Sequence, residues 1–252
     1  MNRQKQTNQK PWPPVGVDWY YSDDYVCIAH GDCREIVPTL GRFDLLLTDP
    51  PYGIGADEAA SKNKGKWGWK YHGETAWDRN APTQETFDML LAVADVSVIW
   101  GGNYFAHMLP PSMGWLAWDK GQKGFSCADF EMAWTSLWVA ARRCMYPRAK
   151  ALGDGKVHPT QKPLDVMRWC VEWADARSQK AQTILDPFAG SGTTGRAAKD
   201  LQRKCVLIER EERYCEIAAR RMRQEVLPLE MPNASLEARA GTTTNGGSGN
   251  DR

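Results

Sequence analysis

Residues 183–209, TILDPFAGSGTTGRAAKDLQRKCVLIE, decide the fold class. An apolar run (183–186) ends in a Gly-rich turn, a helical segment follows to about Leu201, and a second apolar run (204–209) comes next. The order strand, turn, helix, strand predicts a unit with two parallel strands. Gly190 and Gly192 let the backbone approach a ligand closely, and the start of the helix offers free N–H groups.

The same alternation extends along the rest of the chain. Apolar runs predict strands at 25–30, 43–49, 96–100, 115–118, 131–140, 183–186 and 204–209. Apolar residues at helical spacing predict helices over 83–94 and 163–174, a third that ends near Leu201, and a fourth that carries Tyr214 and Met222. We therefore predict an α/β fold with a doubly wound, mostly parallel, seven-stranded Rossmann-like sheet and an antiparallel edge strand.

Length and composition fit one domain with extensions. The chain has 252 residues, of which 42% are apolar and 25% charged, and its net charge of +1 does not point to a polyanionic partner. We predict a flexible arm (1–16), a catalytic domain (17–227) and a disordered tail (228–252). Seven cysteines without a CxxC pair predict reduced thiols and an intracellular protein, and four histidines without ligand spacing predict no metal site.

Polar residues follow several predicted strands, where ligands bind in such sheets. Asp186 precedes the Gly-rich turn, which is not a P-loop because no G-K-[ST] follows. Glu209 ends the next strand and is placed to accept hydrogen bonds from ribose hydroxyls. The alternative for Glu209 is a carboxylate that caps the following helix.

The segment TDPPYGIG (48–55) carries the most information about chemistry. Pro50 and Pro51 have no N–H to donate and hold an extended backbone whose carbonyls remain acceptors. Asp49 adds a carboxylate, and Tyr52 adds an aromatic face. An exocyclic NH2 of a flipped-out base needs acceptors for its hydrogens and a surface for stacking, which these residues supply. The alternative is a Pro-rich turn after a buried strand.

With D-P-P-Y (49–52) preceding F-x-G-x-G (188–192), the sequence resembles the β group of DNA amino-methyltransferases, the N6-adenine/N4-cytosine enzymes. The resemblance covers roughly residues 25–225 and includes GDCREIVPTL (31–40) and HPTQKPLDVM (158–167). It implies a methyltransferase sheet, S-adenosyl-L-methionine as cofactor, double-stranded DNA as partner, and DNA methylation within restriction–modification. It also leaves a homodimer open, because the family often dimerises.

The resemblance assigns roles to residues of this chain. For the target base it implies the catalytic residues Asp49, Pro50, Pro51 and Tyr52. For the cofactor it implies residues at the methionine end (Asp186, Phe188, Gly190, Gly192, Thr193), near the methionine carboxylate (Thr160, Lys162, Pro163), at the ribose (Glu209) and at the adenine (Asp32). Asp before Pro-Pro-Tyr favours adenine N6 as the target. The short gap at 141–157, where the family carries its recognition segment, speaks against elaborate sequence specificity.

Two basic stretches are candidates for DNA contacts. Residues 61–73 carry four lysines and no acid, and residues 141–158 carry five basic residues against one acid. The first stretch lies within the segment 56–80, which is predicted to be a loop that closes over DNA. The residues predicted to bind DNA are Lys62, Lys64, Lys66, Lys70, Arg142, Arg143, Arg148 and Lys150. The alternative for each stretch is a solvated surface loop.

Four readings of the whole chain compete with an adenine-N6 DNA methyltransferase. An N4-cytosine or an RNA amino-methyltransferase would need the same acceptors and stacking ring. A catalytically silent DNA-binding subunit would retain the fold, but the intact D-P-P-Y and Gly-rich turn speak against it. A nicotinamide-dependent oxidoreductase is disfavoured because the dinucleotide fingerprint is incomplete.

Overall fold

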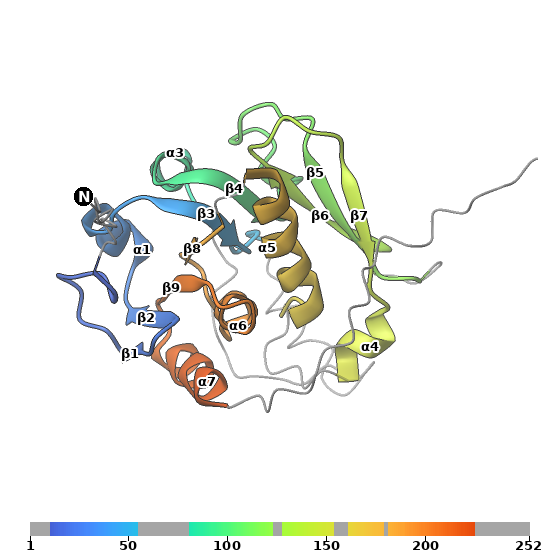
Figure 1. Cartoon of the computed structure of the whole chain (residues 1–252). Coiled ribbons are helices and arrows are strands. Elements are labelled where there is room, and N and C mark those ends of the chain that lie inside the picture. Colours follow the sequence, from blue (N-terminus) through green and yellow to red (C-terminus); the bar gives the residue numbers. More distant parts are fainter. Residues whose placement is uncertain (1–10, 55–80, 123–127, 154–160, 179–180, 225–252) are drawn as a thin grey trace, which may run out of the picture.

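The computed structural model describes residues 11–54, 81–122, 128–153, 161–178 and 181–224. Within these ranges one nine-stranded sheet has the order β1-β2-β9-β8-β3-β4-β6-β5-β7 (Figure 1). The strands are β1 (Tyr21–Ser22), β2 (Val26–His30), β3 (Phe43–Thr48), β4 (Ala94–Trp100), β5 (Trp115–Asp119), β6 (Phe130–Thr135), β7 (Arg142–Met145), β8 (Thr183–Asp186) and β9 (Lys204–Glu209). The helices are α1 (Cys33–Ile36), the 3₁₀ helix η1 (Val37–Thr39), α3 (Gln84–Ala92), α4 (Arg148–Gly153), α5 (Leu164–Ser178), α6 (Thr193–Asp200) and α7 (Glu212–Arg223).

The doubly wound α/β architecture is confirmed, with two more strands than the seven predicted. Strand β1 has only two residues, and β7 (RRCM) has no apolar run, so its extended form comes from parallel pairing with β5. Besides β1 at the edge, the antiparallel strand β6 lies inside the sheet, between β4 and β5. The strand predicted over 131–140 ends at Thr135.

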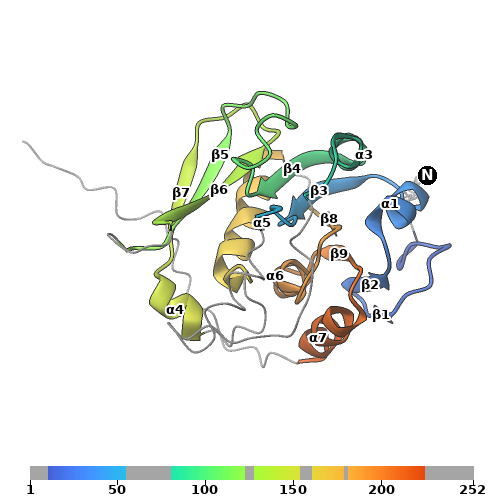
Figure 2. The same ribbon diagram turned by 180° about the vertical axis from the view of Figure 1, so that it is seen from behind.

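Helices cover both faces of the sheet (Figures 1 and 2). Side chains alternate between the faces as the strand period of two requires: Leu45 and Leu47 of β3 pack with α5, α6 and α7, whereas Leu46 packs with α1, η1 and α3. Each face buries its own apolar cluster, so the central strands are apolar on both sides. This explains why they form near-continuous apolar runs in the sequence.

The sheet has its switch point between β3 and β8, which are parallel neighbours with Leu45 opposite Ile184. From β3 the chain continues to β4 on one side, and from β8 it continues to β9 on the other. The loops after β3 and β8 therefore diverge, and a cleft opens between them at the carboxyl ends of the strands.

Several local predictions can be checked directly. Thr83 caps α3, because its hydroxyl accepts a hydrogen bond from the Thr86 N–H. The six described cysteines are free thiols, and five of them are buried. Trp138 falls within the strand predicted over 131–140, but it lies beyond the end of β6 and is 70% exposed. No helix in the described part of the chain has both the length and the apolar character needed to cross a membrane.

Candidate active site

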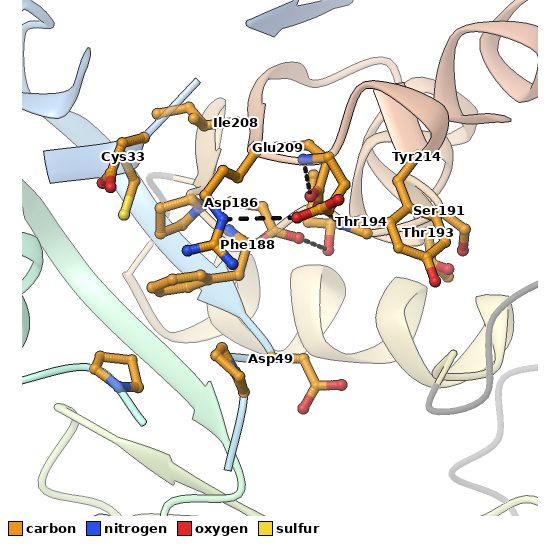
Figure 3. A pocket seen from close by; sticks show the side chains of 18 of the residues that line it. Cys33, Asp49, Asp186, Phe188, Ser191, Thr193, Thr194, Ile208, Glu209 and Tyr214 are labelled. Carbon is orange, nitrogen blue, oxygen red and sulfur yellow. Dashed lines mark hydrogen bonds and ion pairs between the residues drawn. The ribbon is translucent and has the colours of Figure 1, made fainter. Parts of the chain in front are cut away.

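A cavity of about 580 Å³ opens at the switch point (Figure 3). Its walls come from the segments that follow β2, β3, β8 and β9, together with the start of α3. Nine residues predicted from the sequence line it: Asp32, Asp49, Pro51, Lys162, Asp186, Phe188, Gly190, Thr193 and Glu209. The volume lies within the range of roughly 300–1,000 Å³ that is typical of small-molecule sites.

The Asp186 carboxylate holds the Gly-rich turn together. One oxygen accepts hydrogen bonds from the Thr48 hydroxyl (2.7 Å) and the Phe188 N–H (3.1 Å), and the other accepts from the Thr194 hydroxyl (2.6 Å). The Thr48 contact ties the end of β3 to the end of β8. Burial raises the pKa of Asp186 to about 6, although the three hydrogen bonds oppose the shift.

Glu209 accepts a hydrogen bond at the start of the following helix and also lines the cavity, so the ribose role stays a prediction. One oxygen accepts from the Gly190 N–H of the turn (2.7 Å), and the other accepts from the Glu211 N–H at the start of α7 (2.8 Å). The carboxylate also lines the cavity, and burial raises its pKa. Because each carboxylate oxygen has about two acceptor sites, Glu209 retains capacity for a ligand hydroxyl.

Asp32 follows β2, the strand beside β9, and lines the cavity as the N-cap of α1. Its carboxylate accepts from the Arg34 N–H and forms a 2.5 Å ion pair with the Arg34 side chain, which lowers the pKa of Asp32. Asp32 is therefore an ionised acceptor at the cavity wall.

Not every predicted cofactor residue can be placed in the cavity lining. Among the described residues, Gly192 and Pro163 do not belong to its lining, and Thr160 lies outside the described ranges. Gly192 has φ +76°, and a Cβ there would lie 2.8 Å from the Cβ of Ala218. The structural requirement for glycine at 192 is thus close packing against α7.

The Asp-Pro-Pro-Tyr segment leaves β3 beside the cavity. Tyr52 donates a hydrogen bond from its hydroxyl to Asp49 (2.6 Å), and its ring stacks on Tyr104 with centroids 4.7 Å apart. Gly101, at φ +70°, packs so closely on the Tyr52 ring that a Cβ there would overlap it. Asp49 and Pro51 line the cavity, whereas Pro50 and Tyr52 lie behind this lining.

Lys162 lies against Asp49, and the sequence did not predict this contact. Its ammonium donates to Asp49 Oδ2 (2.5 Å) and to the Tyr52 hydroxyl (3.2 Å), and pairs with Glu131 Oε2 (3.1 Å). Glu131 pairs in turn with Lys120 (2.8 Å). The signal that could have revealed Glu131 is a charged residue within the apolar strand FEMAWT, because such a residue needs a partner when buried.

Charges within this cluster set the ionisation of its members. Burial raises the pKa of Asp49, and the Lys162 ammonium and the Tyr52 hydroxyl oppose this effect. Burial alone would also raise the pKa of Glu131, but the ammonium groups of Lys162 and Lys120 outweigh it and lower the pKa to about 2. The carboxylates Asp49 and Glu131 raise the pKa of Lys162 well above its usual range, against the effect of burial.

Four of the eight residues predicted to bind DNA lie near the edge of the sheet opposite β1. The other four lie outside the described residues. Arg142 and Arg143 are on β7, and Arg148 and Lys150 are on α4 (Figure 1). Arg143 pairs with Asp119, and Lys150 pairs with Asp165. The residues outside the described ranges are Lys62, Lys64, Lys66 and Lys70, with the rest of the segment 56–80.

This geometry places two kinds of group around one cavity. Figure 3 shows Glu209, Asp186 and Phe188 in its upper part and Asp49 below them. The upper part offers acceptors for hydroxyl groups and an aromatic side chain, as a nucleoside requires. The lower part offers a buried carboxylate acceptor beside a rigid Pro-Pro exit. A donor molecule and an acceptor amine can therefore meet at the ends of β3 and β8.

Fold and site together define the class of S-adenosylmethionine-dependent methyltransferases. A solved complex of M1.HpyAVI with SAM has a TM-score of 0.52 at 21% identity and covers 78% of this chain and 99% of that chain. The PvuII DNA methyltransferase (cytosine-N4-specific) has a TM-score of 0.53 at 13% identity and covers 84% of this chain and 91% of that chain. At these identities the likeness concerns the fold alone.

Residues 99–220 match the family model described as DNA methylase. The type II methyltransferase M2.MboI of Moraxella bovis is 26% identical over 261 residues, which cover 84% of this chain and 92% of that protein. These two matches support an assignment of the chain as a DNA amino-methyltransferase. The matched range includes Glu131, Lys162 and the Gly-rich turn, whereas the Asp-Pro-Pro-Tyr segment precedes it.

Proposed function

We propose that this enzyme transfers a methyl group from S-adenosylmethionine to the exocyclic N6 of adenine in double-stranded DNA. The observation that carries the proposal is the hydrogen bond between Thr48 and Asp186, which joins the exit of β3 to the Gly-rich turn at one cavity. The Asp-Pro-Pro-Tyr segment that leaves β3 supports an amine as the methyl acceptor. Asp at position 49 favours adenine, through the resemblance to the amino-methyltransferases.

The cavity residues fit the cofactor in their chemistry. Glu209 offers a carboxylate to ribose hydroxyls, Asp32 offers one to the adenine edge, and Phe188 offers an aromatic surface. When bound, S-adenosylmethionine supplies an electrophilic methyl group on a sulfonium. The carboxylate of Asp186, which has no cationic partner among its hydrogen bonds to described residues, gives this part of the cavity acidic character that suits a positively charged ligand.

Asp49 orients the acceptor amine. Its oxygens contact Lys162 and Tyr52, and a carboxylate has about four acceptor sites, so capacity for an amine hydrogen remains. Holding the amine in this way directs its lone pair toward the methyl group, and positioning alone accounts for a large rate gain. The N–C bond forms as the methyl–sulfur bond breaks with its electron pair on sulfur. The surplus proton on nitrogen leaves to solvent.

The experiment is methyl transfer from labelled S-adenosylmethionine to double-stranded DNA, followed by nucleoside analysis of the product. The proposal expects label in N6-methyladenine. Label in N4-methylcytosine, or transfer only to RNA, would replace adenine in DNA as the substrate. Absence of transfer with intact cofactor binding would indicate a silent subunit, and binding of a nicotinamide cofactor instead would indicate an oxidoreductase.

The variant Asp49→Asn tests the role of the carboxylate. It preserves shape but removes the charge, so transfer is expected to fall by at least about 100-fold, a loss of about 3 kcal/mol in the transition state. The affinity for S-adenosylmethionine, measured by calorimetry, should change little. An active Asp49→Asn enzyme would contradict the proposed role.

A further inference from the structure

The ammonium of Lys162 lies at the centre of a buried group of polar side chains. Three acceptors surround it: Asp49 Oδ2 at 2.5 Å, Glu131 Oε2 at 3.1 Å and the Tyr52 hydroxyl at 3.2 Å. An ammonium has three hydrogens, so this geometry can satisfy all of them. The side chain is only 4% exposed, which leaves almost no room for water to substitute for a lost partner.

Glu131 connects this group to a second cation. Its other oxygen, Oε1, lies 2.8 Å from the ammonium of Lys120, which is itself 11% exposed and lies over the Trp118 ring. Acidic and basic side chains thus alternate in one charged row whose net charge is zero. The row consists of Asp49, Lys162, Glu131 and Lys120. Buried charges persist only when they are paired in this way.

The members of this charged row come from separate parts of the fold. Asp49 follows β3, Glu131 lies on β6, and Lys162 precedes α5. Glu131 lies opposite Trp118 across the β5–β6 pair, in fixed register. Asp49 is therefore held by Lys162, which also lines the cavity, and Lys162 is held in turn by a carboxylate that the sheet positions.

From this geometry we infer that Lys162 and Glu131 act as a positioning pair for Asp49, an inference that rests on the proposed function. Lys162 holds Oδ2, so the carboxylate keeps one orientation toward the incoming amine. Glu131 shares the charge of Lys162, so the ammonium does not engage Asp49 alone and Asp49 remains a strong acceptor. Neither residue needs to touch the base.

Lys162 and Glu131 have opposite effects on the pKa of Asp49. The charged or titratable groups facing Asp49 are Lys162, Tyr52, Glu131 and, across the cleft, Asp186. Removing the negative charge of Glu131 strengthens the effect of Lys162 and lowers the pKa of Asp49. Removing the positive charge of Lys162 leaves Asp49 facing acids in a buried site and raises its pKa.

The test compares Glu131→Gln with Lys162→Met in methyl transfer at saturating DNA and cofactor. In both variants kcat should fall at least about 10-fold, with a smaller change in KM. The acidic limb of the pH profile should move to lower pH in Glu131→Gln and to higher pH in Lys162→Met, each by about 1 pH unit. The matched control is Glu172→Gln, the same Glu-to-Gln change at an exposed position of α5, which should leave kcat and the limb in place.

A second readout does not depend on activity. The titration of the Asp49 carboxyl carbon, followed by NMR in the folded wild type and in Glu131→Gln, should shift in the same direction as the limb. If the wild type transfers no methyl group, the proposed function fails, and the NMR titration still decides on the pair. If the pair were purely structural, its substitution would lower thermal stability but would move neither the acidic limb of the pH profile nor the NMR titration of Asp49. That result would overturn the inference.

Discussion

Asp186 couples the stability of the fold to pH. Its pKa is about 6 in the folded protein, against the ordinary value of 3.8, because burial disfavours the charged form. Each pKa unit corresponds to about 1.4 kcal/mol, so complete ionisation of Asp186 costs the folded state about 3 kcal/mol. Since the folded pKa is the higher one, this stability is fully present below pH 3.8 and is lost as the pH rises through about 6.

Part of this loss falls in a range that is convenient for experiment. Between pH 5 and pH 7 the folded protein releases the Asp186 proton, while the unfolded chain is already ionised. The free energy of unfolding should therefore fall by about 1 kcal/mol over this interval through Asp186 alone. The variant Asp186→Asn does not titrate, so it lacks this contribution at every pH.

The assay is urea denaturation of the wild type and of Asp186→Asn at pH 5 and pH 7, without ligand. The difference in unfolding free energy between the two proteins should be about 1 kcal/mol more favourable to the wild type at pH 5. The control is Leu185→Ala, whose side chain is fully buried; it should cost about 2–5 kcal/mol equally at both pH values. A difference for Asp186→Asn that is constant, or larger at pH 7, would refute the argument.

Two further predictions concern the target-base segment and the β7 edge. Gly101→Ala should reduce methyl transfer at least about 10-fold by displacing the Tyr52 ring, whereas Gly16→Ala, also at positive φ but with open space around it, should show only the backbone penalty of about 1 kcal/mol in thermal denaturation. Replacing Arg142 and Arg143 with Gln should weaken DNA binding and reduce the slope of log K against log salt by up to about 2 in fluorescence anisotropy. An unchanged slope would place these arginines outside the DNA contact.

Those parts of the fold that depend on local pattern could be predicted from the sequence. The run KCVLIE is a strand at the predicted bounds, because its residues are buried on both faces. The cap of α3 at Thr83 follows from local hydrogen bonding. By contrast, β7 has two arginines in four residues, and only pairing with β5 makes it a strand, which no local pattern reveals.

The candidate site divides in the same way. The Gly-rich turn and the Asp-Pro-Pro-Tyr segment are contiguous motifs, so the sequence located Asp49 and Asp186 and their common cavity. The contact of Lys162 with Asp49 joins residues that are 113 positions apart, and it could not be read from spacing. The sequence assigned Lys162 to the cofactor; its place in the cavity lining remains compatible with that assignment, but its closest partner is Asp49.

The position of β6 explains physically why one part of the site could not be predicted from the sequence. A sheet built only from parallel strand–helix units would place another parallel strand beside β4, with its carboxyl end at the cavity. The antiparallel strand β6 reverses that direction, so its first residues, including Glu131, lie at the carboxyl end of β4. A carboxylate there reaches Lys162 at the start of α5. The strand that departs from the parallel pattern is therefore the one that supplies the counter-charge of Lys162, the residue that contacts Asp49.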